Sequence, residues 1–263
     1  FDTSLFEGSA SNNTALDNVR NVEYVSVTGT NVYLTLSNAM VASADAQLTI
    51  DASSAGSLTI DGSGVTDTVA SFYLIGTGGV DLVTLGAAND VASLGSSNDV
   101  VDAHFGGDDS MSLGDGADSV NFGNAMGAAD TVNGDSGTDV LSYNDTSSGA
   151  GDELNNVYDV ERVVVTGAVN LTLTNTVFSE TLGSGVGSDA TIDASGATSL
   201  TLDAYNESSS DLLILGTVNA DSVTLGGGSD AVSLGNGNDY VNATRVSNDS
   251  IELGDGNDTV VFG

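Results

Sequence analysis

The sequence predicts an all-β fold in which short parallel strands stack as the coils of a solenoid, of the β-roll or β-helix kind. Three observations carry this prediction. The chain of 263 residues contains a long internal repeat, and inside each copy Asp residues recur at steps of nine or ten residues. Its hydrophobic residues, 40% of the total, fall in short runs of Val, Leu and Ile. A short fixed period of this kind is the signature of coils that stack on one another.

The long repeat divides the chain into two copies. The phrase LDNVRNVEYVSVTG at 16–29 returns as LNNVYDVERVVVTG at 154–167, and SMSLGDGADSVNFG at 110–123 returns as SIELGDGNDTVVFG at 250–263. The last pair lies 140 positions apart. We therefore expect a first copy at 1–123, a joining segment at 124–143 and a second copy at 144–263. The regularly spaced Asp residues occupy 76–123 in the first copy and 216–263 in the second.

The short period places one Asp in every unit of nine or ten residues. Each copy has five such Asp at steps of 9, 9, 10 and 9, and the joining segment has two more. These ladder aspartates are Asp81, Asp90, Asp99, Asp109, Asp118, Asp130, Asp139, Asp221, Asp230, Asp239, Asp249 and Asp258. Gly, Asn or Ala precedes most of them, which suits tight turns, and an aliphatic residue that can point inward usually follows two positions later. Two units should form one coil, so that aspartates two units apart lie above one another.

This pattern resembles the RTX nonapeptide, G-G-x-G-x-D-x-U-x, which binds calcium. The clearest matches are LGDGADSVN at 113–121, LGNGNDYVN at 234–242 and LGDGNDTVV at 253–261, and the resemblance spans 76–142 and 216–263. It implies several Ca²⁺ ions as cofactors, held by the ladder aspartates and by loop glycines. The glycines are Gly114, Gly116, Gly235, Gly237, Gly254 and Gly256. Two first-copy units, LGAANDVAS and LGSSNDVVD, lack the second loop glycine.

Stacked carboxylates favour calcium over other metals on chemical grounds. Two carboxylates brought close together resist ionisation, and a dication between them reverses that penalty. Calcium accepts six to eight oxygen ligands from carboxylates and backbone carbonyls, whereas magnesium requires a stricter octahedron. Zinc prefers Cys and His, and this chain has no Cys and a single His, His104.

The regions at 16–75 and 154–215 carry three-residue strands such as Leu-Thr-Leu at 34–36, without nonapeptide loops. We expect the coil to continue there with polar turns. The NVEYVSVTG phrase predicts a longer strand where the stack bends or is reinforced. Four acidic residues directly follow short strands, and they favour turn roles over ion binding. They are Asp51, Asp61, Asp193 and Asp203.

The charge excludes several classes of partner. The chain has 37 acidic residues against 3 basic ones, a formal net charge of −34. Such a chain cannot neutralise phosphates, so we expect no nucleic acid partner, and anionic membrane surfaces should repel it. No apolar run approaches the length needed to span a bilayer, so we expect no direct membrane insertion. Without disulfides, a secreted fold would need another source of stability, such as a metal.

The sequence shows no catalytic constellation, so we expect the chain not to be an enzyme, with His104 as a loop residue and not a general base. Its style of repeat resembles secreted bacterial surface proteins, namely RTX-type S-layer proteins and large RTX adhesins. That resemblance implies an extracellular location at the bacterial cell surface and self-association with identical or adjacent repeat units. The expected function is a calcium-stabilised structural unit of an S-layer, sheath or filament. An adhesin stalk and the calcium-binding domain of a secreted enzyme are the alternatives, and the chain reads as a window from a longer polypeptide.

Overall fold

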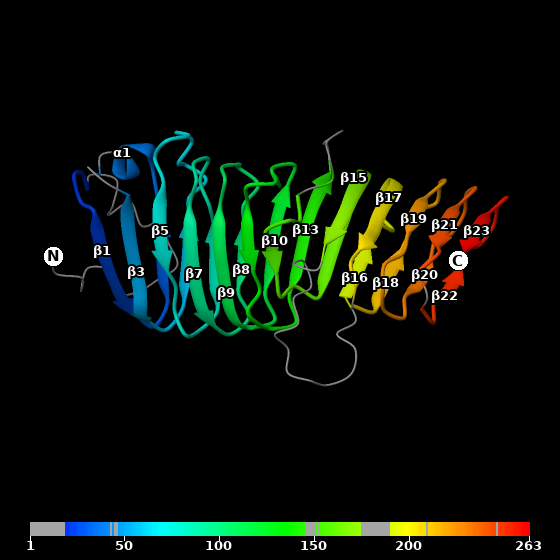
Figure 1. The fold of residues 1–263 in the computed structure, drawn as a ribbon. Coiled ribbons are helices and arrows are strands. Elements are labelled where there is room, and N and C mark those ends of the chain that lie inside the picture. The colour runs from blue at the N-terminus through cyan, green and yellow to red at the C-terminus, as the bar shows by residue number, and fades with distance from the viewer. Residues whose placement is uncertain are drawn as a thin grey trace. The chain divides into compact units, whose positions relative to one another are not determined.

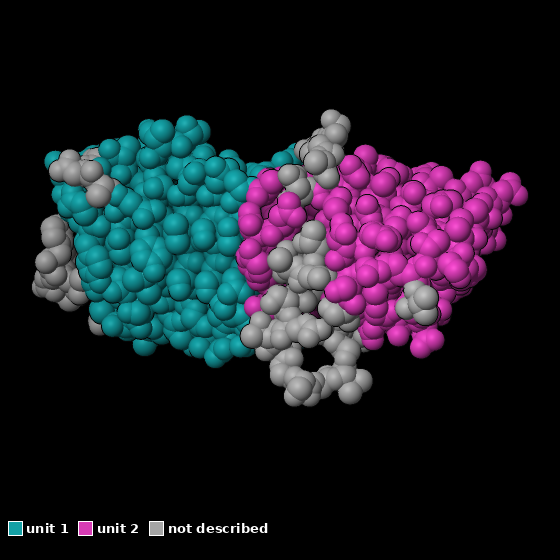
Figure 2. All heavy atoms as spheres, in the orientation of Figure 1, with its two compact units in different colours: residues 1–125, 129–138 teal, residues 126–128, 139–263 magenta. Residues whose placement is uncertain are grey.

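A computed structural model describes residues 19–42, 44, 47–145, 151, 153–174, 190–208, 210–245 and 247–263. The first three residues of the phrase at 16–29 therefore lie outside the described residues. The chain forms two compact units (Figure 2). Unit 1 comprises Phe1–Ala125 and Ala129–Thr138, and unit 2 comprises Met126–Ala128 and Asp139–Gly263. The segment at 124–143 thus contributes residues to both units.

Short strands make up almost all of the regular structure in the described residues (Figure 1). Unit 1 contains β1 (Tyr24–Gly29), β2 (Val32–Thr35), α1 (Asn38–Val41), β3 (Leu48–Ala55), β4 (Leu58–Asp61), β5 (Phe72–Ile75), β6 (Asp81–Thr84), β7 (Val91–Ser96), β8 (Val100–Asp102), β9 (Ser110–Gly116), β10 (Ser119–Gly123), β11 (Thr131–Asn133) and β12 (Ser136–Gly137). Unit 2 contains β13 (Val140–Asp145), β14 (Val157–Tyr158), β15 (Arg162–Thr174), β16 (Ala190–Asp193), β17 (Ala197–Asn206), β18 (Leu212–Leu215), β19 (Ser222–Thr224), β20 (Ala231–Ser233), β21 (Tyr240–Ala243), β22 (Ser250–Glu252) and β23 (Thr259–Phe262).

Unit 1 is a parallel β-solenoid with two sheets. Strands β1, β3, β5, β7, β9 and β11 form one sheet in that order, and β2, β4, β6, β8 and β10 form the other (Figure 1). From β1 to β11, consecutive strands therefore alternate between the sheets, as a coiling chain requires. The register stacks Val83 on Val101 and Val101 on Val120. Like residues of successive coils thus form straight columns.

Unit 2 repeats this arrangement. One row runs β16, β18, β20 and β22, and the other runs β17, β19, β21 and β23. The 13-residue β15 pairs with both rows. Its first residues, Arg162 to Val164, pair with β16, and the stretch from Gly167 to Thr174 pairs with β17. The register shifts between Gly167 and Ala168, so the VxVTG phrase of the second copy belongs to a long strand that pairs with both rows. In the first copy the matching phrase forms the six-residue β1, which pairs with β3.

The hydrophobic core fills the space between the sheets of each unit. The aliphatic residues that follow a ladder aspartate by two positions are 3% exposed or less at Val83, Val101, Val120, Val223, Val232 and Val241. The two in the final coil, Ile251 and Val260, are only half-buried. Strand β5 shows the underlying pattern, because Phe72 and Leu74 are buried while the residues between and after them are partly exposed. This period of two is what a sheet with one face inward dictates.

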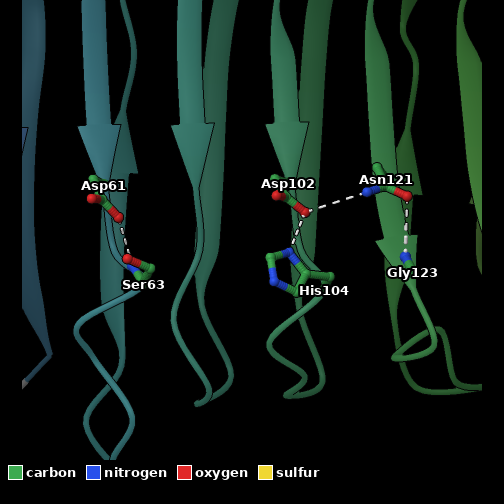
Figure 3. A network of polar contacts seen from close by, with 6 residues as sticks. All are labelled: Asp61, Ser63, Asp102, His104, Asn121 and Gly123. Atoms are coloured by element: carbon green, nitrogen blue, oxygen red, sulfur yellow. Dashed lines mark hydrogen bonds and ion pairs between the residues drawn. The ribbon is translucent and has the colours of Figure 1, made fainter.

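The polar turns outside the ladder use aspartates in the role that the sequence favours. In each case a carboxylate oxygen accepts the backbone N–H two residues later, which is an Asx turn. The pairs are Asp51 with Ser53 (3.0 Å), Asp61 with Ser63 (3.0 Å), Asp193 with Ser195 (3.1 Å) and Asp203 with Tyr205 (3.0 Å). Figure 3 shows the Asp61–Ser63 turn at the end of β4.

Candidate metal site

Each ladder aspartate lies where the chain enters a strand. Within each unit these aspartates stack from one coil to the next. The backbone N–H of Asp81 donates to Oδ1 of Asp99 (2.8 Å), and the N–H of Asp99 donates to Oδ1 of Asp118 (2.6 Å). The same link joins Asp90 to Asp109 (2.9 Å), Asp109 to Asp130 (2.7 Å), Asp221 to Asp239 (2.9 Å), Asp239 to Asp258 (2.9 Å) and Asp230 to Asp249 (3.2 Å). The predicted stacking of aspartates two units apart is therefore present in the structure. The part played by Oδ1 in joining coils was not foreseen, because nonapeptide spacing says nothing about backbone donors.

These carboxylates are enclosed. All ladder aspartates up to Asp239 are 3% exposed or less, while Asp249 and Asp258 in the last coil are half-buried. In four of them the second oxygen is buried without a hydrogen-bond donor, namely Oδ2 of Asp99, Asp109, Asp230 and Asp239. A buried carboxylate oxygen without a partner is costly. The ladder therefore presents oxygens that fit a cation.

The basic side chains of the chain are engaged elsewhere. The chain has no Lys, and its three basic residues are Arg20, Arg162 and Arg245. Arg162 pairs with Asp193 at 2.5 Å. Arg245 donates to backbone carbonyls, including that of Glu207 (3.0 Å), and stacks over the ring of Tyr205. Charge compensation for the ladder must therefore come largely from solution ions.

Burial shifts the acidity of the ladder strongly. It raises the pKa of Asp90 to about 6, those of Asp99 and Asp230 to about 7, and that of Asp109 to about 8. Neighbouring carboxylates add to the effect of burial, such as Asp130 beside Asp109. Desolvation and like charges both disfavour the ionised form. A bound dication would act in the opposite direction and hold the carboxylates ionised.

The loop glycines allow successive coils to approach closely. A Cβ on Gly114 would lie 1.9 Å from the carbonyl oxygen of Gly95, and one on Gly254 would lie 1.7 Å from that of Gly235. For Gly116, Gly235, Gly237 and Gly256 the corresponding distances to a carbonyl oxygen of the preceding coil are 2.0, 2.5, 2.6 and 1.4 Å. Rows of loop carbonyls therefore stack beside the carboxylates. Carboxylate and carbonyl oxygens are the donor set that calcium prefers.

The donors of this site are spread along the ladder. Within the described parts of the chain, no group of three or more His, Cys, Asp or Glu side chains converges on one point. An ion here would be held by paired aspartates of stacked coils together with loop carbonyls. That arrangement needs only one acidic residue per nonapeptide unit.

A comparison with protein families agrees with this donor set. The sequence model of one family, the RTX calcium-binding nonapeptide repeat, matches residues 75–108, 124–141, 213–242 and 246–263. These segments are RTX calcium-binding nonapeptide repeats. The RTX segments bind calcium, with several ions across the repeats. No curated protein and no solved structure matches the chain. Asp109 and Asp118 lie between two matched segments, yet they stack in the same columns as the matched aspartates.

Glu161 is a ladder residue that the nonapeptide frame misses. Its Oε2 accepts the backbone N–H of Asp139 (2.7 Å), so it takes the place that an aspartate holds in the other links. Burial raises the pKa of Glu161. Glu161 directly precedes β15, just as Asp99 directly precedes β8. An acidic residue directly before a strand was therefore the sequence feature that could have identified it.

Asparagines next to the ladder make a second, reciprocal set of links. Oδ1 of Asn98 accepts the N–H of Ala117 (3.0 Å), while the adjacent Asp99 donates its N–H to Asp118. The equivalent bonds in other coils run from Asp108 to Asn89 (3.0 Å) and from Asn257 to Asn238 (2.9 Å). In the Asn-Asp dipeptide, the Asn side chain therefore accepts a bond from the following coil and the Asp side chain accepts one from the preceding coil.

The single histidine lies in the turn after β8. Its Nδ1 is 2.6 Å from Oδ1 of Asp102, and its ring stacks at 3.9 Å on that of Phe105. The side-chain amide of Asn121 donates to the same Asp102 oxygen at 3.5 Å, and Oδ1 of Asn121 accepts the N–H of Gly123 (Figure 3). His104 is 43% exposed and bonds to Asp102 within its own turn, while Asn121 links Asp102 to the next coil. His104 is a loop residue, as expected.

Proposed function

We propose that the chain is a calcium-stabilised structural repeat of an extracellular bacterial surface assembly, such as an S-layer, sheath or filament. The observation that carries this proposal is the occurrence of the same calcium ladder in both units. Each unit is a solenoid whose coils are joined through buried carboxylates, and the sequence unit that encodes it recurs after 140 residues. Repeats of this kind extend by addition of further copies, as structural arrays require.

The same chemistry supports an extracellular location. RTX repeats are typical of secreted bacterial proteins. Calcium ligands of this type suit the millimolar calcium outside cells. No helix in the described regions is both long and apolar enough to cross a membrane. We propose that the chain works outside the cell, without nucleic acid partners, and associates with identical or adjacent repeat units.

We further propose that this region is scaffold and not enzyme. The buried acidic pairs, which could otherwise suggest acid–base catalysis, belong to the coil-to-coil links and the calcium ladder. The Asp102–His104 pair lies in an exposed turn, and the imidazole ring of His104 packs on the ring of Phe105.

Electron microscopy of the purified chain at millimolar calcium tests the assembly. An ordered lattice or uniform fibre that disperses with chelator supports the proposal. Isolated single molecules at high protein concentration would favour the adhesin stalk. Measurement of bound calcium on the same sample separates loss of assembly from loss of ion binding.

A further inference from the structure

The first aspartate of each ladder accepts a side-chain hydroxyl from its own loop, unlike the aspartate one coil later on the same sheet. In unit 1, the hydroxyl of Thr77 donates to Oδ1 of Asp81 (2.8 Å), and the backbone N–H of Thr77 donates to Oδ2 (2.7 Å). In unit 2, Thr217 makes the same two bonds to Asp221, at 2.9 and 2.7 Å. Both oxygens of each carboxylate therefore have donors inside their own loop.

The threonines are built into these loops. Thr77 and Thr217 are 4% and 3% exposed. Their hydroxyl oxygens also accept the N–H two residues later, from Gly79 (2.9 Å) and Asn219 (3.0 Å). The hydroxyl thus closes the turn and donates to one carboxylate oxygen, while the backbone N–H of the same threonine donates to the other. The same geometry in two copies of different loop sequence, GTGGVD and GTVNAD, points to a selected arrangement and not to chance.

The next coil on the same sheet has no such side chain. Four residues before Asp99 and Asp239, where the first coil has threonine, the chain has Gly95 and Gly235. There, Oδ2 of Asp99 and of Asp239 is buried without a hydrogen-bond donor. The exchange of threonine for glycine therefore coincides with the change from a satisfied carboxylate to an unsatisfied one.

We propose that Thr77 and Thr217 replace a calcium ion in the first coil of each ladder, so that Asp81 and Asp221 bind none and ion binding on this sheet begins at Asp99 and Asp239. The proposal rests on calcium binding by the RTX repeats. Oδ1 of Asp221 already accepts two donors, the N–H of Leu200 (2.9 Å) and the threonine hydroxyl, and Oδ2 accepts a third. An ion at Asp221 would have to displace these bonds, whereas an ion at Asp239 meets a vacant oxygen.

The number of bound ions tests this in the full 263-residue chain. Urea unfolding is followed at a series of calcium concentrations, because the slope of the unfolding free energy against the logarithm of free calcium counts the ions released. Direct calcium titration of the folded protein provides the second count. The variants are Asp221→Asn, Thr217→Val and Thr217→Ser, with Asp239→Asn as the matched variant one coil later.

We expect Asp221→Asn and Thr217→Val to retain the wild-type ion count and to lower stability by the same amount at every calcium concentration. Thr217→Ser keeps the hydroxyl and should restore most of the loss. Asp239→Asn should bind at least one calcium ion fewer than the wild-type chain. A lower ion count in Thr217→Val or Asp221→Asn would overturn the proposal. A wild-type chain without calcium-dependent stability would overturn calcium binding itself, which is a distinguishable result.

Discussion

A ladder aspartate such as Asp239 has two separable roles, one for each carboxylate oxygen. Oδ1 accepts the backbone N–H of the aspartate one coil earlier, as Asp239 does for Asp221 (2.9 Å). Oδ2 of Asp239 is buried and has no such donor. The first role holds coils together without metal, and the second creates the need for one.

The loop glycine at Gly237 gives a prediction about coil spacing. A Cβ there would lie 2.6 Å from the carbonyl oxygen of Asn219 and 2.7 Å from Oδ1 of Asp239, and its φ is +144°. Gly237→Ala should therefore lower the unfolding free energy by about 1–3 kcal/mol, the usual cost of such backbone strain. Urea denaturation at millimolar calcium measures this.

The equivalent residue of the first copy, Ser97, is the control for this prediction. It already carries a Cβ at φ +84°, and its hydroxyl donates to the carbonyl of Gly78 (3.1 Å) on an exposed surface. Ser97→Ala should change stability by well under about 1 kcal/mol, as exposed substitutions usually do. Equal losses in the two variants would refute the close approach at Gly237.

The raised pKa values of the ladder carboxyls predict how the calcium-free chain responds to pH. The pKa values of Asp99 and Asp109 are raised from 3.8 to about 7 and about 8 in the folded state. Between pH 4 and 8 the folded state therefore binds more protons than the unfolded state, so stability falls as pH rises. In chelator, the strand signal in circular dichroism should be stronger at pH 5 than at pH 8. Asp109→Asn should flatten this dependence, and a strand signal that rises with pH in chelator would contradict the burial of ionised carboxylates.

At the scale of elements, sequence period predicted the solenoid and its inward face. The nine-residue step fixed where Val101 and Val241 point, because a three-residue strand has only one inward position. The nine-residue step could not predict the 13-residue length of β15, which depends on pairing with both rows of unit 2. Glu161 was missed for a related reason, since it enters the ladder from outside the nonapeptide frame.

The asparagines beside the ladder give a prediction about coil-to-coil bonding. Oδ1 of Asn238 accepts the N–H of Asn257 (2.9 Å). Asn238→Ala should lower stability by about 1 kcal/mol, the typical net value of one hydrogen bond, and should leave the number of bound calcium ions unchanged. Calcium titration combined with urea unfolding measures both quantities.

Asn238→Asp is the matched variant, because it keeps the acceptor oxygen. Asp211 shows that an aspartate can fill this role, since its Oδ1 accepts the N–H of Ser229 at 2.5 Å. Asn238→Asp should therefore lose less stability than Asn238→Ala at saturating calcium. A loss of bound calcium in Asn238→Ala would show that the asparagine acts on the ion site and not on the backbone alone.

At the scale of the whole molecule, charge and fold oppose each other until calcium binds. A formal charge of −34 in 26.1 kDa opposes compaction by self-repulsion. The composition and the Asp period were enough to predict calcium as the compensating ion. The division of roles within the ladder was not predictable, because nonapeptide spacing does not show that Thr77 donates to both oxygens of Asp81 while Oδ2 of Asp99 has no donor.

Calcium should therefore control folding of the whole chain. In chelator, circular dichroism should show mainly coil, and millimolar calcium should produce strand signal, because ions that bind only the folded state shift the equilibrium toward it. Sodium chloride at the same ionic strength separates the two physical causes. It screens the repulsion between exposed charges but cannot reach buried oxygens such as Oδ2 of Asp230. Salt alone should thus recover only a small part of the signal, and a chelated sample with its full strand signal would show that the backbone links suffice without calcium.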